Sequence, residues 1–475
     1  MVRKTKIVCT IGPATESPKM ITELIKAGMN VARLNLSHGS SEEHLERIQV
    51  IRRCGEELGV NVGILLDIKG PKIRIGELNP DKFEIEAGHE LILTTEECTG
   101  TAEKIFVNYP YLVEDLNPGD TIYIDDGLIE LVVLSKIEKH LICKVIVGGT
   151  IGSRKGVTLP GVNIKLPPLT EEDIKHIQLG VEYGVDFIAA SFVRQADHVV
   201  AIKDLIHRFG GDIPVIAKIE SGEGIRNIDA IIQAADGIMV ARGDMGVEIP
   251  PEEVPLAQKM IIQKCNDQGK PVITATQMLD SMIRNPRATR AEITDVANAI
   301  LDGTDAVMLS GETAVGRYPI KAVALMNSIA LRIERSMDYQ ARLEARRRNR
   351  RQNIADAISL ATVQTAHDLG AAAILCSTQS GATARSIAKY RPEALLIAVC
   401  HSEAVVNQLM MTWGVNPILA KKPDTLEELI DVAIHSAKEK GLVKEGDIVA
   451  ITAGVKTGVP GSTNLLQVQQ IGADD

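Results

Sequence analysis

Two short charged runs, each directly after an apolar segment, are the residues of this chain best suited to catalysis. Lys218-Ile219-Glu220 ends an apolar segment that starts at Pro214, and Arg242-Gly243-Asp244 follows one that starts at Gly237. An apolar run that stops abruptly in charge is typical of a buried parallel strand whose carboxyl end opens into a site. Mg²⁺ binds few protein carboxylates and keeps positions for water and phosphate, and a nearby ammonium stabilises a developing oxyanion. The pattern therefore predicts metal-assisted chemistry on an anionic substrate.

The elements that must position these residues recur at regular intervals along the chain. Eight short apolar segments end in a polar residue, and helical patterns such as 19–27, 42–58 and 257–268 lie between most neighbours. The segments are 5–12, 31–36, 62–68, 187–192, 214–220, 237–244, 271–276 and 305–312. Eight strand–helix units predict an α/β protein built on a (β/α)8 TIM barrel, formed by residues 1–69 and 168–336.

One interval is far longer than the rest and predicts an inserted domain. Between the third and fourth segments the chain runs through residues 70–167, from Gly70-Pro71 to Leu166-Pro167-Pro168. Strand-like segments at 83–85, 90–93, 121–124, 130–135 and 141–147 alternate with turn-rich stretches. We interpret the insert as a small β-barrel placed as a lid over the barrel mouth, where closure would exclude water.

The pattern of alternating helices and strands restarts near the C-terminus. Residues 337–353 include the run Arg346-Arg347-Arg348-Asn349-Arg350-Arg351, which we interpret as a charged linker or a solvated helix face. Residues 354–475 predict a separate α/β domain. Its expected helices are 354–369, 381–390, 403–414 and 425–441, and its expected strands are 371–378, 395–400, 415–419, 447–454 and 465–471.

Composition narrows the class of protein. The 475 residues are 45% hydrophobic but only 3% aromatic, with a formal net charge of −10. Few aromatics and an acidic balance argue against nucleic acid and anionic membranes as partners. Seven scattered cysteines without a C-x-x-C pair predict reduced thiols. We saw neither a signal-peptide core nor a membrane-length apolar span, so we expect a cytoplasmic protein.

Active sites of TIM barrels lie at the carboxyl ends of the strands, and here those ends carry a mixed set of polar residues. The set comprises Arg33, Asn35, Ser37, His38, Asp67, Ser191, Lys218, Glu220, Arg242, Asp244, Thr276, Ser310 and Glu312, with Arg74 just beyond the third strand. A lone aspartate there is usually a helix cap, but cations, carboxylates and hydroxyls on eight adjacent strand ends indicate a catalytic site.

These residues belong to motifs through which the whole chain resembles the pyruvate kinase family. Nine motifs occur in the family's order, among them Asn30-Val-Ala-Arg-Leu-Asn-Leu-Ser-His-Gly, Leu66-Asp-Ile-Lys-Gly-Pro-Lys and Met239-Val-Ala-Arg-Gly-Asp-Met-Gly-Val-Glu. The resemblance implies transfer of phosphate from phosphoenolpyruvate to ADP, giving pyruvate and ATP. Phosphoryl transfer depends on positioning and charge neutralisation, which suits the residue types at the strand ends.

The resemblance also implies roles for individual residues. Glu220 and Asp244 would hold Mg²⁺, and Lys218 would neutralise charge on the transferring phosphoryl group and the enolate. Arg33 would contact the phosphate, and backbone amides around Gly243 with the Thr276 hydroxyl would hold the carboxylate. A water relay past Thr276 and Ser310 could protonate the enolate, although the sequence leaves the proton donor open. Asn35, His38, Arg74 and Lys155 would face the nucleotide, with Asp126 and the lid closing on it.

One position departs from the family's potassium-dependent members. Many members carry a glutamate where this chain has Lys72, and their counterparts of Asn35, Ser37, Asp67 and Ile68 form a K⁺ site. An ammonium near Asp67 could supply the missing charge, since two unit charges about 4 Å apart interact by about 4 kcal/mol at an effective dielectric of 20. We therefore predict activity without K⁺; the alternative is a solvent-facing lysine with K⁺ still bound.

The C-terminal domain resembles the family's effector domain. The run Thr378-Gln379-Ser380-Gly381-Ala382-Thr383 follows a strand and opens a helix, so its amides and hydroxyls could cradle a phosphate. Residues 454–462 could close over the same pocket. Gln379 departs from the lysine found where fructose 1,6-bisphosphate is the activator, so AMP or a sugar monophosphate is the better expectation. The alternative is an ordinary strand–helix turn.

The predicted function is thus a cytoplasmic, Mg²⁺-dependent pyruvate kinase that uses phosphoenolpyruvate and ADP. The resemblance implies a homotetramer. Two alternatives stay open at this point: a magnesium–enolate TIM-barrel lyase acting on 2-oxo acids, and a catalytically silent metabolite sensor. A lyase would have no need of Lys155, Arg74 or a lid, and a sensor should have lost residues such as Lys218.

Overall fold

The computed structural model of this protein describes residues 2–348, 353–454 and 463–472. At its centre eight parallel strands close into a barrel in the order β1-β16-β15-β14-β13-β12-β3-β2. The strands are β1 (Lys6–Ile11), β2 (Val31–Asn35), β3 (Gly63–Ile68), β12 (Phe187–Ala190), β13 (Val215–Ile219), β14 (Gly237–Ala241), β15 (Val272–Ala275) and β16 (Ala306–Leu309). The predicted TIM-barrel fold class is confirmed.

Helices surround this barrel, as the strand–helix alternation predicts. They are α1 (Pro18–Ala27), α2 (Ser41–Leu58), α4 (Glu171–Glu182), α5 (Ala196–Arg208), α6 (Gly222–Arg226), α7 (Ile228–Ala234), α8 (Arg242–Glu248), α9 (Val254–Gln268), α10 (Arg290–Asp302), α11 (Gly311–Ala314) and α12 (Pro319–Glu334), with short 3₁₀ turns at Pro251–Glu253 and Asp280–Ile283. Side chains cap several of their N-termini: Ser40 and Glu43 form a capping box on α2, and Thr289 and Glu292 form one on α10. Local sequence thus sets where these helices begin.

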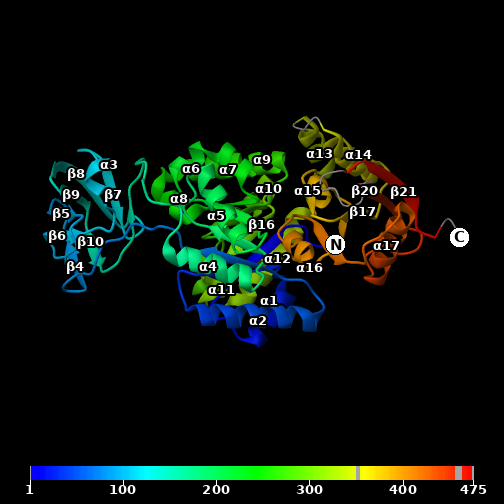
Figure 1. Ribbon diagram of the computed structural model, residues 1–475, viewed down its shortest axis with the longest axis horizontal. Coiled ribbons are helices and arrows are strands. Elements are labelled where there is room, and N and C mark those ends of the chain that lie inside the picture. Colours follow the sequence, from blue (N-terminus) through cyan, green and yellow to red (C-terminus); the bar gives the residue numbers. More distant parts are fainter. Residues whose placement is uncertain (1, 349–352, 455–462, 473–475) are drawn as a thin grey trace.

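The segment between β3 and β12 folds into a separate unit, built mainly of β-strands, at one end of the molecule (Figure 1). Its elements are β4 (Lys82–Ile85), β5 (Glu90–Thr94), β6 (Lys104–Phe106), α3 (Leu112–Asp115), β7 (Thr121–Ile124), β8 (Ile129–Ile137), β9 (His140–Val147), β10 (Gly149–Gly152) and β11 (Val157–Thr158). Hydrogen bonds divide the strands into a six-stranded sheet, β11-β7-β8-β9-β5-β6, and a two-stranded sheet, β10-β4. Both sheets contribute to one hydrophobic core that is distinct from the barrel's core.

The C-terminal domain lies at the other end of the molecule (Figure 1). A five-stranded sheet has the order β19-β18-β17-β20-β21, in which only β21 pairs antiparallel. Its elements are α14 (Ile354–Asp368), β17 (Ala373–Thr378), α15 (Ala382–Ala388), β18 (Leu395–Cys400), α16 (Glu403–Leu409), β19 (Val415–Leu419), α17 (Leu426–Glu439), β20 (Ile448–Ala453) and β21 (Leu465–Gln470).

The charged residues between the barrel and the C-terminal domain form a helix, α13 (Tyr339–Arg348). The prediction of a charged linker or solvated helix face is only partly right. Arg342 donates to the carbonyl of Leu301, and Arg346 donates to the carbonyl of Lys389. Leu343 of the same helix is buried. The helix therefore turns part of its basic face toward its neighbours, because main-chain carbonyls there accept the guanidinium hydrogens. The rest of the run, 349–352, lies outside the described residues.

Side chains from the C-terminal domain reach into the foot of the barrel, the end opposite the catalytic mouth. Met411 packs with Val8, Leu65 and Ile216 inside the barrel.

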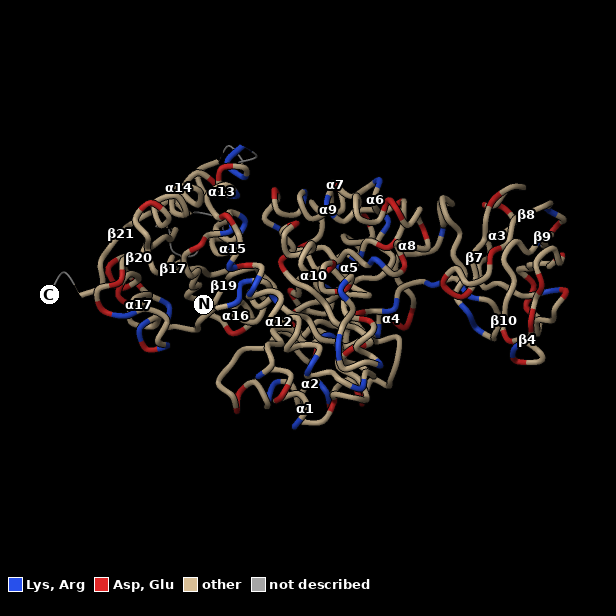
Figure 2. Tube along the Cα trace, turned by 180° about the vertical axis from the view of Figure 1, so that it is seen from behind, with Lys and Arg blue, Asp and Glu red and all other residues tan. Residues whose placement is uncertain are grey.

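Lysines, arginines and carboxylates are spread over all three parts (Figure 2). Within the described residues no helix is both long and apolar enough to cross a membrane.

Candidate active site

A buried lysine stands at the centre of the charged residues at the barrel mouth. The Lys218 ammonium lies 3.1 Å from Asp67 Oδ1 and 3.1 Å from Glu220 Oε1, and it donates to Ser191 Oγ at 2.6 Å. Asp67 in turn accepts from Arg33 Nε at 2.7 Å. The strands β2, β3, β12 and β13 carry these residues or precede them directly. Adjacent strand ends therefore bring together residues that lie far apart in the sequence.

These charges hold one another in their ionised forms. Burial alone would raise the pKa of Asp67, but the Lys218 and Arg33 charges keep it below its usual value. Burial alone would lower the pKa of Lys218, but Asp67 and Glu220 keep it above its usual value. Glu220 differs, because burial and the charge of Asp244 raise its pKa despite Lys218. The site thus offers one firmly protonated cation and one carboxylate that lacks full compensation.

The second charged run forms the first turn of α8. Arg242 is held by Asp295 of α10, which accepts at 2.7 Å from each of its two terminal nitrogens, and by the Thr276 carbonyl at 2.8 Å. Asp244, two residues further on, has a side chain that is 38% exposed, and its Oδ1 lies 3.6 Å from the Lys72 ammonium. The Gly243 amide donates to Thr276 Oγ1 at 2.8 Å. The two groups expected to hold a carboxylate thus bond to each other in this structure.

Backbone strain gathers at the same strand ends. Phe192, Thr276 and Gln277 have φ values of 54°, 68° and 55°, in the left-handed region that side chains other than glycine rarely adopt. Phe192 uses this conformation to donate its amide to Glu220 Oε2 at 2.6 Å. Such strain persists where the surrounding structure holds it in place, and it is concentrated at functional sites.

The end of β16 carries a hydroxyl to which no group of the described residues bonds. Glu312 accepts from the amides of Leu279 and Ser310 at 3.0 and 2.7 Å, which fixes the turn after the strand. Ser310 Oγ is buried and has no hydrogen-bond partner among the described residues. A group in the mouth could therefore use this hydroxyl.

Lys72 does not lie where the sequence argument put it. Its ammonium is 3.6 Å from Asp244 Oδ1 and 3.9 Å from Asp126 Oδ1, and forms no ion pair with Asp67 among the described residues. Asp67 is already neutralised by Arg33 and Lys218, so the lysine side chain extends toward the uncompensated Asp244 instead. The expected charge is present at the mouth but acts on a different carboxylate.

Three of the four groups of the expected K⁺ site already accept hydrogen bonds from the protein. Asn35 Oδ1 accepts from the Ser37 amide at 3.3 Å, and the Ile68 carbonyl accepts from Ser191 Oγ at 2.8 Å. Asp67 accepts from two cations, as described above. Of the described residues, no group of three or more His, Cys, Asp or Glu side chains is arranged to hold a metal.

The candidate nucleotide residues lie on the barrel and near the base of the inserted unit. Asn35 ends β2, and His38 is exposed in the loop that follows. Arg74 donates to the carbonyl of Arg154 at 2.9 Å, and the Lys155 ammonium is 3.0 Å from Asp125 Oδ1. Arg74 and Lys155 are thus held on neighbouring chain segments, since Arg74 also pairs with Gly156.

In the C-terminal domain the candidate effector loop connects β17 to α15. Gly381 has φ 77° and precedes the helix, and Thr383 Oγ1 lies 2.8 Å from Thr463 Oγ1. The loop turns as expected for a strand–helix junction, and Gln379 is exposed. Most of the predicted closing segment, 455–462, lies outside the described residues.

Sequence reasoning missed two residues that shape the mouth. Asp295 lies inside helix α10, where nothing in the local pattern marks it as a partner of Arg242. Glu248 ends α8, and burial, with Asp244 adding to it, raises its pKa to about 7. Both depend on tertiary contacts. For Asp295 the only signal in the sequence was a charged residue on a helix, whereas Glu248 lies at the end of the family motif that begins at Met239.

The closed parallel barrel and its charged mouth define a TIM-barrel enzyme for an anionic substrate. Two family models match the chain: "Pyruvate kinase, barrel domain" over residues 2–323 and "Pyruvate kinase, alpha/beta domain" over residues 356–469. The chain belongs to the pyruvate kinase family. It is therefore a phosphotransferase that transfers the phosphoryl group of phosphoenolpyruvate to ADP.

Individual relatives agree with this assignment. The chain is 52% identical to the pyruvate kinase of Geobacillus stearothermophilus, over 99% of this chain and 81% of the relative. It is 50% identical to that of Clostridium acetobutylicum, over 99% of this chain and 100% of the relative. A crystal structure of a pyruvate kinase from Cryptosporidium parvum superposes with a TM-score of 0.94 at 40% identity, covering 98% of this chain and 96% of that one. These relatives support the kinase, and neither the lyase nor the sensor.

Proposed function

We propose that Lys218 is the catalytic cation of this phosphotransferase. The observation that carries the proposal is its buried ammonium, 3.1 Å from both Asp67 and Glu220 at the barrel mouth. A cation held in place before reaction stabilises charge as it develops on the transferring phosphoryl group and on the enolate oxygen. Asp67 and Ser191 orient the ammonium, so little reorganisation is needed.

Membership of the pyruvate kinase family implies dependence on Mg²⁺, and we assign Glu220 and Asp244 as its ligands. The two carboxylates fit a divalent cation because their mutual repulsion contributes to the raised pKa of Glu220, and a bound cation would relieve it. Bound Mg²⁺ would supply charge neutralisation to the substrate oxygens. Lys72, 3.6 Å from Asp244, partly fills that role in the present structure.

Other residues around Lys218 position the substrate. Arg33 contacts the phosphate with the guanidinium nitrogens that Asp67 and Thr10 leave free. The carboxylate takes the Gly243 amide and the Thr276 hydroxyl as donors, replacing the bond between them and the bond that Thr276 Oγ1 donates to the Ala275 carbonyl. Ser310, whose buried hydroxyl has no partner among the described residues, completes with Thr276 a path for the proton that the enolate takes up.

The nucleotide lies between the barrel and the inserted unit in this proposal. Asn35 and His38 approach it from the barrel, and Arg74 and Lys155 approach it from the base of the insert. Lys155 is paired with Asp125, and Lys72 reaches Asp126 of the same turn, so a phosphate chain would compete for both ammonium groups. The inserted unit then acts as the lid.

We further propose that turnover does not require K⁺, because Lys72 already brings a positive charge to the mouth. The loop from Thr378 to Thr383 is the proposed site of a phosphorylated effector such as AMP or a sugar monophosphate. The proposed assembly is a homotetramer in the cytoplasm; light scattering on the purified protein measures its mass directly.

Pyruvate formation from phosphoenolpyruvate tests the proposal, measured with ADP and Mg²⁺ in buffers with and without K⁺. We expect turnover that needs both ADP and Mg²⁺ and changes less than twofold on adding K⁺. Turnover that appears only with K⁺ would contradict the role given to Lys72 and leave the kinase assignment intact. Absence of ADP-dependent pyruvate in both buffers would contradict the catalytic assignment.

A further inference from the structure

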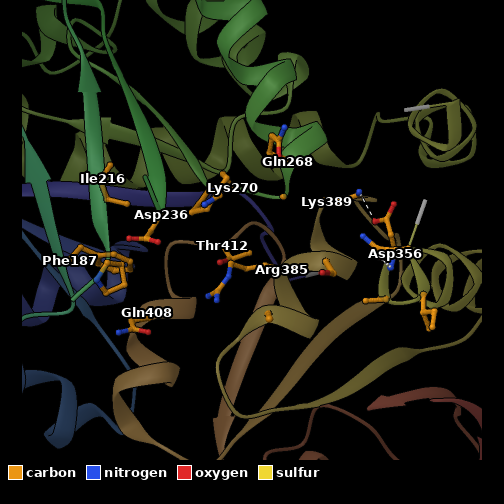
Figure 3. Close-up of a pocket in the computed structure, with 18 residues that line it drawn as sticks. Phe187, Ile216, Asp236, Gln268, Lys270, Asp356, Arg385, Lys389, Gln408 and Thr412 are labelled. Carbon is orange, nitrogen blue, oxygen red and sulfur yellow. Dashed lines mark hydrogen bonds and ion pairs between the residues drawn. The ribbon is translucent and has the colours of Figure 1, made fainter. Parts of the chain in front are cut away.

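A cavity of about 690 Å³ lies between the foot of the barrel and the C-terminal domain (Figure 3). On the barrel side it is lined by Pro214, Asp236 and Pro271, which directly precede β13, β14 and β15. The opposite ends of these three strands carry the catalytic residues. The cavity is thus separate from the mouth, and its volume is typical of a site for a small molecule.

One face of α15 forms much of the other wall, together with residues 353–356 at the start of α14 and with Gln408 and Thr412. Ala382, Arg385, Ser386 and Lys389 line the cavity, and their spacing of three, four and seven residues places them on one side of α15. Thr383, which belongs to the proposed effector loop, bonds to Thr463 instead and does not line the cavity. The cavity thus borders the effector loop, since Ala382 belongs to both, but its lining does not include Thr383.

The charges that line the cavity are not all balanced. Lys389 is paired with Asp356 at 2.6 Å, and Asp236 is paired with Lys203 at 2.8 Å. Arg385 donates to the Ser380 carbonyl at 2.7 Å, but no carboxylate of the described residues lies within ion-pair distance of its guanidinium. Burial lowers the pKa of Arg385, and the more distant Asp236 only partly offsets this. A desolvated guanidinium without a counterion favours binding of an anion.

A second, independent observation comes from another residue of the C-terminal domain, which Figure 3 shows near Arg385. Thr412 lines the cavity and is 3% exposed, and its hydroxyl has no hydrogen-bond partner among the described residues. A buried hydroxyl without a partner is costly and is usually satisfied by water or a ligand. Gln268 and Gln408 line the same cavity and supply amides. The wall thus combines a cation with several neutral hydrogen-bonding groups.

We propose that this interdomain cavity is a binding site for a small organic anion, a carboxylate or a phosphate, whose charge pairs with Arg385 and whose polar groups reach Thr412. The ligand contacts the barrel and the C-terminal domain at once. Its site is separate from the mouth and borders the Thr378–Thr383 loop, whose Ser380 carbonyl accepts from Arg385.

The test is isothermal titration calorimetry of the full chain with inorganic phosphate and with succinate, each against chloride at equal ionic strength. We expect Arg385→Gln to bind one anion fewer per chain than the wild type, or to bind it at least tenfold more weakly. Arg335→Gln, which removes an exposed arginine outside the cavity, is the matched control and should bind like the wild type. Phosphate sites at the mouth remain in every variant and cancel in the comparison. Because Arg385 also holds the Ser380 carbonyl of the effector loop, the loss is assigned to the cavity when Thr412→Val, which leaves that loop intact, weakens the same binding. The probe that shows the difference identifies the anion as a phosphate or a carboxylate.

Thr412→Val gives a second test that does not depend on folding of the arginine variant. Removing an unpartnered hydroxyl should leave Tm in chloride equal or higher, yet weaken binding of the same anion severalfold. Thr362→Val, in which the lost hydroxyl had a partner in the Ile358 carbonyl, should lower Tm and leave anion binding unchanged. Equal anion stoichiometry and affinity in the wild type and Arg385→Gln would overturn the proposal, as would unchanged binding in Thr412→Val where Arg385→Gln does not fold.

Discussion

Lys218 is the residue on which the interactions of the mouth converge. Its ammonium contacts Asp67, Glu220 and Ser191, and each of these is itself at least nine-tenths buried. In such surroundings a unit charge is expensive to remove, because its partners are left without compensation. Lys218 therefore balances the buried negative charges before the reaction and, in our proposal, stabilises the charge that develops during it.

The first prediction is that Lys218→Met abolishes turnover while substrate still binds. We expect kcat to fall about 1000-fold or more, since a preorganised charge on the transferring group is lost. The free energy of unfolding should also fall by about 3 kcal/mol, because Asp67 and Glu220 lose a buried partner. Steady-state kinetics, calorimetric binding of phosphoenolpyruvate with Mg²⁺ and urea unfolding measure the three quantities.

Lys264→Met is the control for that change, since it breaks an exposed pair with Asp229 far from the mouth. It should leave kcat within twofold. Near-normal turnover of Lys218→Met would remove Lys218 from its catalytic role.

The second prediction concerns Lys72, whose ammonium is 3.6 Å from Asp244. Replacing it by glutamate puts a negative charge beside Asp244, and at about 4 Å two unit charges interact by about 4 kcal/mol at an effective dielectric of 20. A monovalent cation could compensate that charge. We expect Lys72→Glu to lose at least about tenfold in kcat/KM without K⁺ and to regain most of it when K⁺ is added.

Assays across a series of K⁺ concentrations at constant ionic strength measure this response. Lys69→Glu changes the nearby lysine that pairs with the exposed Glu172, and should show no K⁺ response. An equal K⁺ response in Lys72→Glu and the wild type would contradict the assignment.

At the scale of elements, the short helix α8 depends on its neighbours for its position. It contains only seven residues, too few to be stable alone, and no side chain caps its N-terminus. Arg242 ties its first turn to Asp295 of α10 and to the Thr276 carbonyl at the end of β15. Asp244 reaches the mouth because these contacts hold the turn.

The third prediction follows from that contact: Asp295→Asn should loosen α8 and displace Asp244 without touching the substrate. We expect the KM for phosphoenolpyruvate and the half-saturating Mg²⁺ concentration to rise about tenfold, with a smaller change in kcat. Asn298→Gly, at an exposed position of the same helix, lowers helix propensity without touching Arg242 and should change neither value. Equal effects of the two variants would show that α10 stability, and not the position of α8, is responsible.

At the scale of the whole molecule, buried polar contacts join the barrel to the C-terminal domain. Arg391 pairs with Asp305 at 2.9 Å just before β16, and the Trp413 amide donates to the same carboxylate at 3.1 Å. Lys6 in β1 donates to the carbonyl of Val415 in β19 at 2.6 Å. These contacts surround the foot of the barrel, where Met411 also packs.

The fourth prediction uses Lys6, which is 4% exposed and whose pKa is lowered by burial to about 7. In the unfolded chain the amine keeps its usual value of 10.5, so between these values the unfolded state binds more protons. Stability from this residue therefore rises with pH above 7. We expect the free energy of unfolding of the wild type, relative to Lys6→Met, to increase by about 2 kcal/mol between pH 7 and pH 9.

Urea unfolding of both proteins at the two pH values measures the difference. Lys19→Met, on an exposed position of α1, controls for the loss of a lysine as such. A wild-type advantage that stays constant or shrinks as pH rises would contradict the buried, easily deprotonated amine.

Periodicity was enough to predict the barrel and the C-terminal α/β domain, because each strand must be apolar where it is buried and each helix must keep one apolar face. The predicted strand 237–244 shows the limit of that reasoning. The strand β14 ends at Ala241, and Arg242 to Asp244 begin α8 instead. Residues 242–244 could either extend the strand or begin a helix. Only the contacts with Asp295 and Thr276 decide in favour of the helix.

The sequence by itself determined the order of the elements, the family motifs and which residues end the strands. These depend on local periodicity and residue type, which the chain carries without reference to its fold. Only the tertiary structure decided that Lys72 faces Asp244 and not Asp67, that Asp295 supports α8, and that Arg385 faces an interdomain cavity. Ion pairs and cavities form between segments that lie far apart in the chain. The partner of a charged side chain there depends on the direction in which it points and on which of the charges around it are already paired.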